Sequence, residues 1–183
     1  MRMVWLGTGT VLLVAACAFR HYFYARPPIG TGPAGPEVAR ADFEKLWTER
    51  PVLLLGLGDS ITAGYGASTG LSYFDRLVRN PPGEFGNLKG VCLEAALPNL
   101  TVRNASVSGS TSLDCLERQL PSLEPAPPET FGLVAVTTGG NDVIHMYGRI
   151  PPREGAMYGA TIEQARPWIA NFEKRLDDIV RGI

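Results

Sequence analysis

Three short stretches of the sequence carry groups suited to acyl transfer. Gly58-Asp59-Ser60-Ile61 supplies a serine hydroxyl that could act as a nucleophile. Asn104-Ala105-Ser106-Val107-Ser108-Gly109 supplies the backbone N–H of a glycine, and Gly139-Gly140-Asn141-Asp142 supplies a side-chain amide. If these groups face one point, the hydroxyl can attack a carbonyl carbon while the donors stabilise the oxyanion that forms. The three stretches therefore predict a nucleophile and an oxyanion hole.

Each stretch follows a run of residues typical of a β-strand. The first run, Val52-Leu53-Leu54-Leu55-Gly56-Leu57, has the apolar character of a buried strand in a parallel sheet, and the third run is also expected to be buried. Strands that alternate with helices favour a parallel, right-handed sheet, in which the carboxyl ends of the strands share one edge. We therefore expect the three stretches to meet. The predicted strands are 52–59, 100–105 and 131–137, and the predicted helices are 41–50, 71–78, 88–96, one capped by Thr111 or Ser112, and one after the capping box Thr161-Ile162-Glu163-Gln164.

Together, the three stretches resemble the motifs of the GDSL/SGNH hydrolase family, a family of serine esterases and lipase-like enzymes. They occur in the family's order and spacing, and the resemblance covers roughly residues 51 to 183. It implies a three-layer α/β/α, flavodoxin-like fold and the hydrolysis of carboxylic esters without a metal or organic cofactor. By this resemblance Ser60 is the nucleophile and its own N–H joins the oxyanion hole, Gly109 gives a second backbone N–H, and Asn141 gives the side-chain donor.

The general base is the point where the sequence departs from the family. The family's catalytic Asp and His come from an Asp-x-x-His segment after the last strand, and the sequence has no histidine after His145. Asp142-Val143-Ile144-His145 has that spelling but overlaps the asparagine stretch, so His145 is expected on the helix or loop after the third strand and not as the base. His21 lies outside the expected hydrolase domain and is not expected to be catalytic. Without a histidine base, a serine hydrolase keeps little turnover, so the chain is expected to be nearly inactive by itself.

The predicted sheet is also short. Three strands are readable where five or six are common, and an unpaired edge on the third strand would be costly. We therefore expect a sheet truncated after the third strand and its following helix, in a fragment of a longer domain.

A non-catalytic module of the same fold, which binds acyl or glycan ligands, is the alternative that the sequence leaves open. Ser60 could serve only as a helix cap, Gly109 only as a tight turn, and Asn141 only as a turn before a helix. Asp59 is expected to brace its own turn. The substrate also stays open between acetylated glycans, lysophospholipids and short acyl esters. Nucleotide binding is not supported, because Ile61 stands where a dinucleotide motif needs its third glycine.

Composition limits the class of protein. The chain has 183 residues, of which 45% are hydrophobic, and a net charge of -1, which suits one globular domain with a core. Lys and Arg are not clustered, so no nucleic acid partner is expected. Cys17, Cys92 and Cys115 lack the close pairing of a metal site. For Cys92 and Cys115, free buried thiols are favoured over a disulfide.

The amino terminus predicts export. The segment 3–19 carries no charged residue and is slightly shorter than a typical membrane span, which needs about 20 residues. Three interpretations stay open: a lipoprotein signal in which Val14-Ala15-Ala16-Cys17 leads to a lipidated Cys17, an uncleaved membrane anchor, and a cleaved signal peptide. A periplasmic or extracellular location, or a membrane tether, would follow. The expected domains are the signal or anchor at 1–19, a Pro/Gly-rich linker at 20–40, and the hydrolase domain at 41–183.

Overall fold

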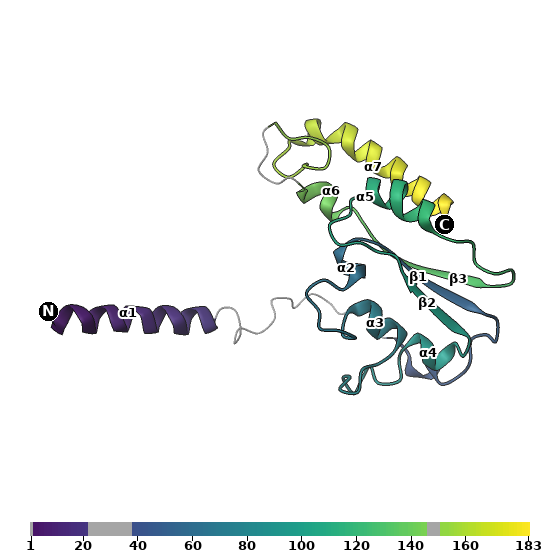
Figure 1. Ribbon diagram of the computed structural model, residues 1–183, viewed down its shortest axis with the longest axis horizontal. Helices are drawn as coiled ribbons and strands as arrows, with labels where there is room; N and C mark the ends of the chain where they lie inside the picture. The colour runs from purple at the N-terminus through teal and green to yellow at the C-terminus, as the bar shows by residue number, and fades with distance from the viewer. Residues whose placement is uncertain (1, 22–37, 146–150) are drawn as a thin grey trace. The chain divides into compact units, whose positions relative to one another are not determined.

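The computed structural model describes residues 2–21, 38–145 and 151–183, which fall into two compact units, Met1–Glu37 and Val38–Ile183 (Figure 1). The first unit contains one helix, α1 (Arg2–Arg20). Within the described residues, no helix is long and apolar enough to cross a membrane. The Pro/Gly-rich part of the expected linker lies outside the described residues.

The second unit is built on a parallel sheet of three strands. β1 (Val52–Gly58) lies between β2 (Leu100–Asn104) and β3 (Phe131–Thr137), in the order β2-β1-β3. Gly56 pairs with Asn104 on one side and with Ala135 on the other, so all three strands end at the same edge of the sheet. The parallel sheet predicted from the alternating pattern is confirmed.

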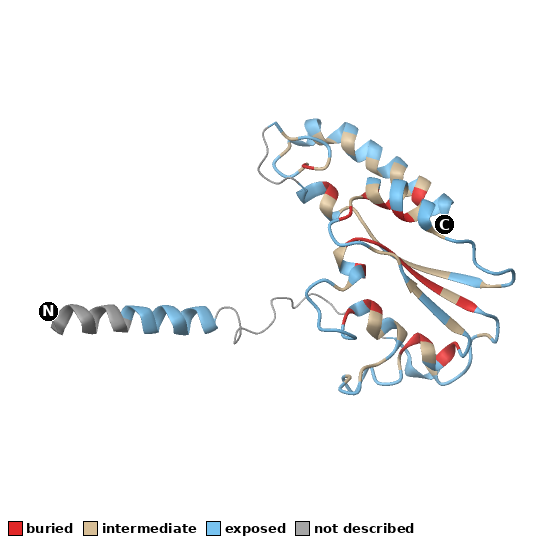
Figure 2. Cartoon of the chain, in the orientation of Figure 1, coloured by how far each residue is buried: buried red, intermediate tan, exposed pale blue. Residues whose placement is uncertain are grey.

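Helices cover both faces of the sheet, which gives the predicted three-layer α/β/α arrangement (Figure 1). Alternate residues of β1 point to opposite faces, and each set anchors a separate core. Figure 2 shows that buried residues gather along β1 and on the helix sides that face it. The first core lies under α3 (Tyr73–Val78) and α4 (Leu93–Ala96) and contains Val52, Leu54, Phe74, Leu93 and Leu97.

The second core contains Leu55, Leu57, Cys115 and Ile179. It is covered by α5 (Ser112–Asp114), η3 (Cys115–Gln119), η4 (Leu120–Ser122) and α7 (Ile162–Gly182).

Two predicted helices are shorter than expected. The helix predicted at 41–50 is wrong, because only the single 3-10 turn η2 (Arg40–Phe43) forms there. The Trp47 indole N–H donates to the Asp42 carbonyl at 2.6 Å, which takes the acceptor that a continuing helix would use. The Trp47 backbone N–H donates to Ala96 at 2.9 Å instead of to its own turn. The helix predicted at 88–96 is reduced to α4.

The predicted caps and thiols agree with the structure, whereas the predicted burial of the third strand does not. Thr111 and Asp114 form a capping box on α5, as Thr161 and Gln164 do on α7. Cys92 and Cys115 are free and buried. The expectation that β3 is buried is wrong, since all seven of its residues are exposed or half-buried. Among the described strands, β3 forms an edge of the sheet, so it has a neighbouring strand on one side only.

Candidate active site

The first turn places Ser60 at the start of a short helix, directly after β1. Gly58 has φ +104°, and a Cβ there would lie 1.8 Å from the Thr137 carbonyl oxygen, so only glycine fits. The Asp59 N–H donates to that same carbonyl at 2.9 Å. The Asp59 carboxylate accepts from the Ile61 N–H at 3.0 Å and from the Thr137 hydroxyl at 2.8 Å. Asp59 therefore braces the turn, as expected from the sequence, and also caps α2 (Ser60–Ala63).

Ser60 is the first residue of α2 and is partly exposed. Because Asp59 is the cap, the interpretation of Ser60 as a helix cap is wrong. No described residue forms a hydrogen bond with the Ser60 hydroxyl or with the Ser60 backbone N–H. Both groups are therefore available to a bound molecule.

The second turn presents Gly109 beside the first. Gly109 is exposed, has φ +87°, and its N–H finds no acceptor among the described residues. The turn is fixed to the end of β1, because the Val107 N–H donates to the Gly58 carbonyl at 3.0 Å. The buried Gln119 amide adds a second link, since its Nε2 lies 2.8 Å from the Gly58 carbonyl oxygen and 3.1 Å from the Ser110 hydroxyl.

The third turn is fixed to the second by the asparagine itself. Asn141 lies in α6 (Gly140–Ile144), and its Nδ2 donates to the Ser110 carbonyl at 2.8 Å. An amide nitrogen carries two N–H groups, so one remains for another acceptor. Three contacts thus link each stretch to another stretch or to a residue close beside it: Val107 to Gly58, Asp59 to Thr137 at the end of β3, and Asn141 to Ser110. The structure brings together the three stretches that the sequence singled out.

His145 lies beside the second turn and not at Ser60. It follows α6, is exposed, and donates its backbone N–H to the Asn141 carbonyl at 2.8 Å. In the described part of the chain, no hydrogen bond joins His145 to Ser60. A cavity of about 430 Å³ is lined by Val107, Ser108, Gly109, Ser110, Asp114, Arg118, Gln119 and His145.

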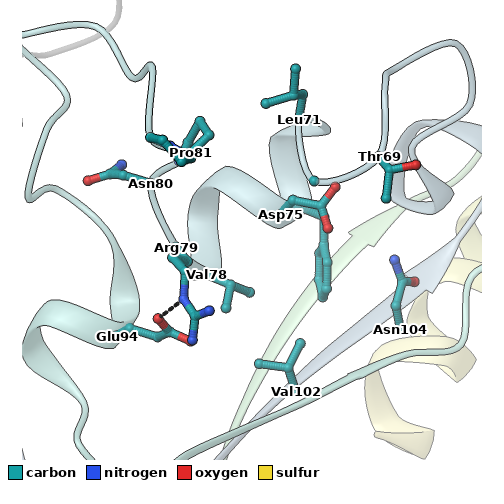
Figure 3. Close-up of a pocket in the computed structure, with 13 residues that line it drawn as sticks. Thr69, Leu71, Asp75, Val78, Arg79, Asn80, Pro81, Glu94, Val102 and Asn104 are labelled. Atoms are coloured by element: carbon teal, nitrogen blue, oxygen red, sulfur yellow. Dashed lines mark hydrogen bonds and ion pairs between the residues drawn. The ribbon is translucent and has the colours of Figure 1, made fainter.

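A larger groove of about 730 Å³ runs along β2 and α3, and does not include Ser60, Gly109 or Asn141 (Figure 3). Its charged rim is already paired, because Arg79 forms two hydrogen bonds to Glu94, at 2.5 and 2.8 Å. The groove approaches the site only at Asn104, whose Nδ2 donates to the Thr62 carbonyl of α2 at 2.8 Å. The candidate site is therefore defined by the hydrogen bonds between the turns and not by the volume of this groove.

Metal ligands are not gathered at this site. Over the ranges that the structure describes, no group of three or more His, Cys, Asp and Glu side chains could hold a metal ion. The reactive groups at the turns are a hydroxyl, backbone N–H groups and an amide.

Sequence reasoning missed four residues that hold the turns: Ser112, Gln119, Thr137 and Arg175. Ser112 was considered only as a helix cap. Gln119 and Arg175 carry a signal that could have identified them, since each is polar on an apolar helix face. Arg175 has helical spacing with Phe172 and Ile179, and its side chain is only 13% exposed.

Comparison with known proteins agrees with the motifs. Residues 57–181, more than half of the chain, match the model of the GDSL-like lipase/acylhydrolase family. No curated protein and no solved structure matches the chain significantly.

Proposed function

The chain belongs to the GDSL-like lipase/acylhydrolase family, and we propose that it hydrolyses carboxylic esters with Ser60 as the nucleophile. The Ser60 oxygen attacks the carbonyl carbon while its proton passes to a base, and the carbonyl oxygen becomes an oxyanion. The N–H groups of Ser60 and Gly109 and the free N–H of the Asn141 amide donate to that oxyanion. Expulsion of the alcohol leaves an acyl-enzyme, which water hydrolyses.

The pairwise hydrogen bonding of the three turns is the observation that supports this proposal. These bonds link the turns that carry the hydroxyl and the donors, at the edge of the sheet where ligands bind in open α/β folds. The Ser60 and Gly109 N–H groups have no acceptor among the described residues, so they are available to an oxyanion. Preorganised donors of this kind stabilise the transition state without moving.

The proposed mechanism needs a base to accept the Ser60 proton, but no described residue forms a hydrogen bond with the Ser60 hydroxyl. Since no described histidine reaches the Ser60 hydroxyl, we expect the 183-residue chain alone to turn over esters slowly. In subtilisin, the loss of the histidine costs about 10⁶ in turnover. In the family, an Asp-x-x-His segment supplies the base, and the proposed reaction requires a base of this kind at Ser60.

Replacing the nucleophile tests the proposal. In the full-length product, Ser60→Ala should remove nearly all hydrolysis of p-nitrophenyl acetate, because no other group would form the acyl-enzyme. Ser68→Ala serves as a control, since Ser68 is an exposed loop serine, and should keep the wild-type rate. Equal rates for wild type and Ser60→Ala would remove Ser60 from the mechanism.

A ligand-binding module without catalysis is the second candidate, and the absence of a described base at Ser60 favours it. Such a module would bind acyl or glycan ligands without hydrolysing them. A full-length product that binds an ester in equilibrium dialysis and returns it intact would select this alternative.

We further propose export of the protein, with residues 3–19 or a lipidated Cys17 as a membrane tether. The uncharged segment behind Arg2 and the lipobox-like Val14-Ala15-Ala16-Cys17 support this. Fractionation of cells that express the full-length product tests it, and recovery of the uncleaved protein in the cytosol alone would refute it.

A further inference from the structure

We propose that Arg175 is a positioning residue for Asn141: from α7 it fixes the carboxylate next to the amide that donates to the oxyanion. This inference rests on the proposed function and adds to it a residue that is remote from Ser60 in the sequence. It is carried by a chain of contacts from α7 through α5 to α6, helices that lie next to one another in Figure 1.

Asp142 is the centre of these contacts. Its side chain is 3% exposed, and it follows Asn141 directly. The Ser112 backbone N–H donates to one carboxylate oxygen at 2.8 Å, and the Ser112 hydroxyl donates to the other at 2.5 Å. A carboxylate held at both oxygens leaves α6 little freedom to rotate against the start of α5.

Arg175 completes the set with a different nitrogen for each partner. Its Nε donates to the Ser112 hydroxyl at 2.8 Å, and its Nη2 lies 3.5 Å from the Asp142 carboxylate. Its Nη1 donates to Glu154, which also accepts from Asn171 at 3.2 Å. The Ser112 hydroxyl therefore accepts from Arg175 and donates to Asp142, which fixes the direction of its hydrogen bond. A lysine has one nitrogen and cannot reproduce this fork.

The route to Asn141 is short. The segment 110–112 accepts the Asn141 amide at the Ser110 carbonyl and holds Asp142 through Ser112, so adjacent residues of α6 are fixed to adjacent parts of one segment. Removal of the guanidinium would leave the buried Asp142 carboxylate without its cation, and would also leave Glu154 without its arginine partner. Such an uncompensated charge is costly, and we expect the first turn of α6 to move, which would redirect the free N–H of Asn141.

The kinetic test compares arginine variants in the full-length product with p-nitrophenyl acetate as substrate. Arg175→Met should lower kcat by about 10- to 100-fold with KM changed less than about threefold, because a misplaced oxyanion donor affects the transition state more than binding. Arg175→Lys keeps the charge and should recover part of kcat. Arg181→Met removes an exposed α7 arginine, paired with Asp177 at 2.7 Å, and should leave both constants unchanged.

Coupling to Asn141 separates a positioning role from loss of stability. Asn141→Ala should lower kcat by about 10²–10³, and adding Arg175→Met to it should cause little further loss, because the two changes remove one function. If the double variant instead loses kcat by the product of the two single losses, the proposal is overturned. An unchanged kcat in Arg175→Met, or an equal loss of kcat in Arg181→Met, would also overturn it.

Hydrogen exchange tests the same proposal without catalysis. Arg175→Met should speed exchange in residues 140–144, while residues 73–78 on the opposite face of the sheet stay as protected as in wild type. Unchanged exchange in residues 140–144 would overturn the positioning role even if no ester is hydrolysed. Failure of the proposed function would show differently: wild type and Ser60→Ala would then hydrolyse p-nitrophenyl acetate at equal rates.

Discussion

At the scale of single residues, backbone geometry decides where Ser60 can lie. Gly58 combines a left-handed φ of +104° with a Thr137 carbonyl oxygen only 1.8 Å from the place of a Cβ. The Asp59 N–H bonds to that same carbonyl, so the close approach is part of the turn. Glycine is therefore required at position 58, directly before Asp59 and Ser60, by packing as well as by its φ angle.

This geometry predicts a large loss of stability for Gly58→Ala. The substitution should lower the free energy of unfolding by at least about 3 kcal/mol, because it adds a backbone clash to the unfavourable φ. Gly66→Ala is the matched control, with φ +82° and no atom within 4 Å of the new Cβ, and should cost about 1 kcal/mol. Urea denaturation measures both, and equal losses would show that the Thr137 contact is unimportant.

At the scale of elements, the sequence predicted what local chemistry determines. The capping box at Thr161 and a helix cap at Thr111 or Ser112 were predictable, since each is satisfied within four residues. The absence of a helix at 41–50 was not predictable, because Trp47 bonds to Ala96, a partner 49 positions away in the sequence. The contacts of Gln119 and Arg175 are equally non-local, so the sequence pointed to the three turns but not to the side chains that hold them together.

The capping box on α5 predicts a dependence of stability on pH. The Thr111 N–H is the main cause of a pKa of Asp114 below its ordinary 3.8; the Thr111 hydroxyl, Arg118 and His145 lower it further, and burial opposes them. Because the pKa of Asp114 is lower in the folded state, its carboxylate stabilises the fold at any pH above its pKa in the unfolded chain. This stabilisation is lost as the pH falls through its pKa in the folded state.

Asp114→Asn should therefore flatten the acid side of the stability profile, below about pH 5. Gln164→Ala is the control, because it removes the equivalent neutral side chain from the box on α7, and should lower stability evenly across that range. Urea unfolding at each pH gives both profiles. An unchanged acid slope in Asp114→Asn would contradict the role of this carboxylate.

At the scale of the whole molecule, the alternation of strands and helices was enough to predict the fold class and the edge where the turns meet. It could not predict that β3 is half-exposed, because an apolar strand looks alike in the middle and at the edge of a sheet. In the described sheet β3 has one neighbour, and Phe131 and Val136 are exposed on it. Burial depends on which neighbours a strand has, and a run of apolar residues does not encode that.

The most direct test of the central claim is a crystal structure of the full-length product after reaction with diethyl p-nitrophenyl phosphate. The Ser60 oxygen should bond to phosphorus as p-nitrophenolate leaves, and the phosphoryl oxygen should stand where the oxyanion forms. We predict that this oxygen lies about 2.7–3.1 Å from the Gly109 nitrogen and the Asn141 Nδ2. A phosphoryl group on another residue, or an oxygen beyond hydrogen-bonding distance of both donors, would contradict the account.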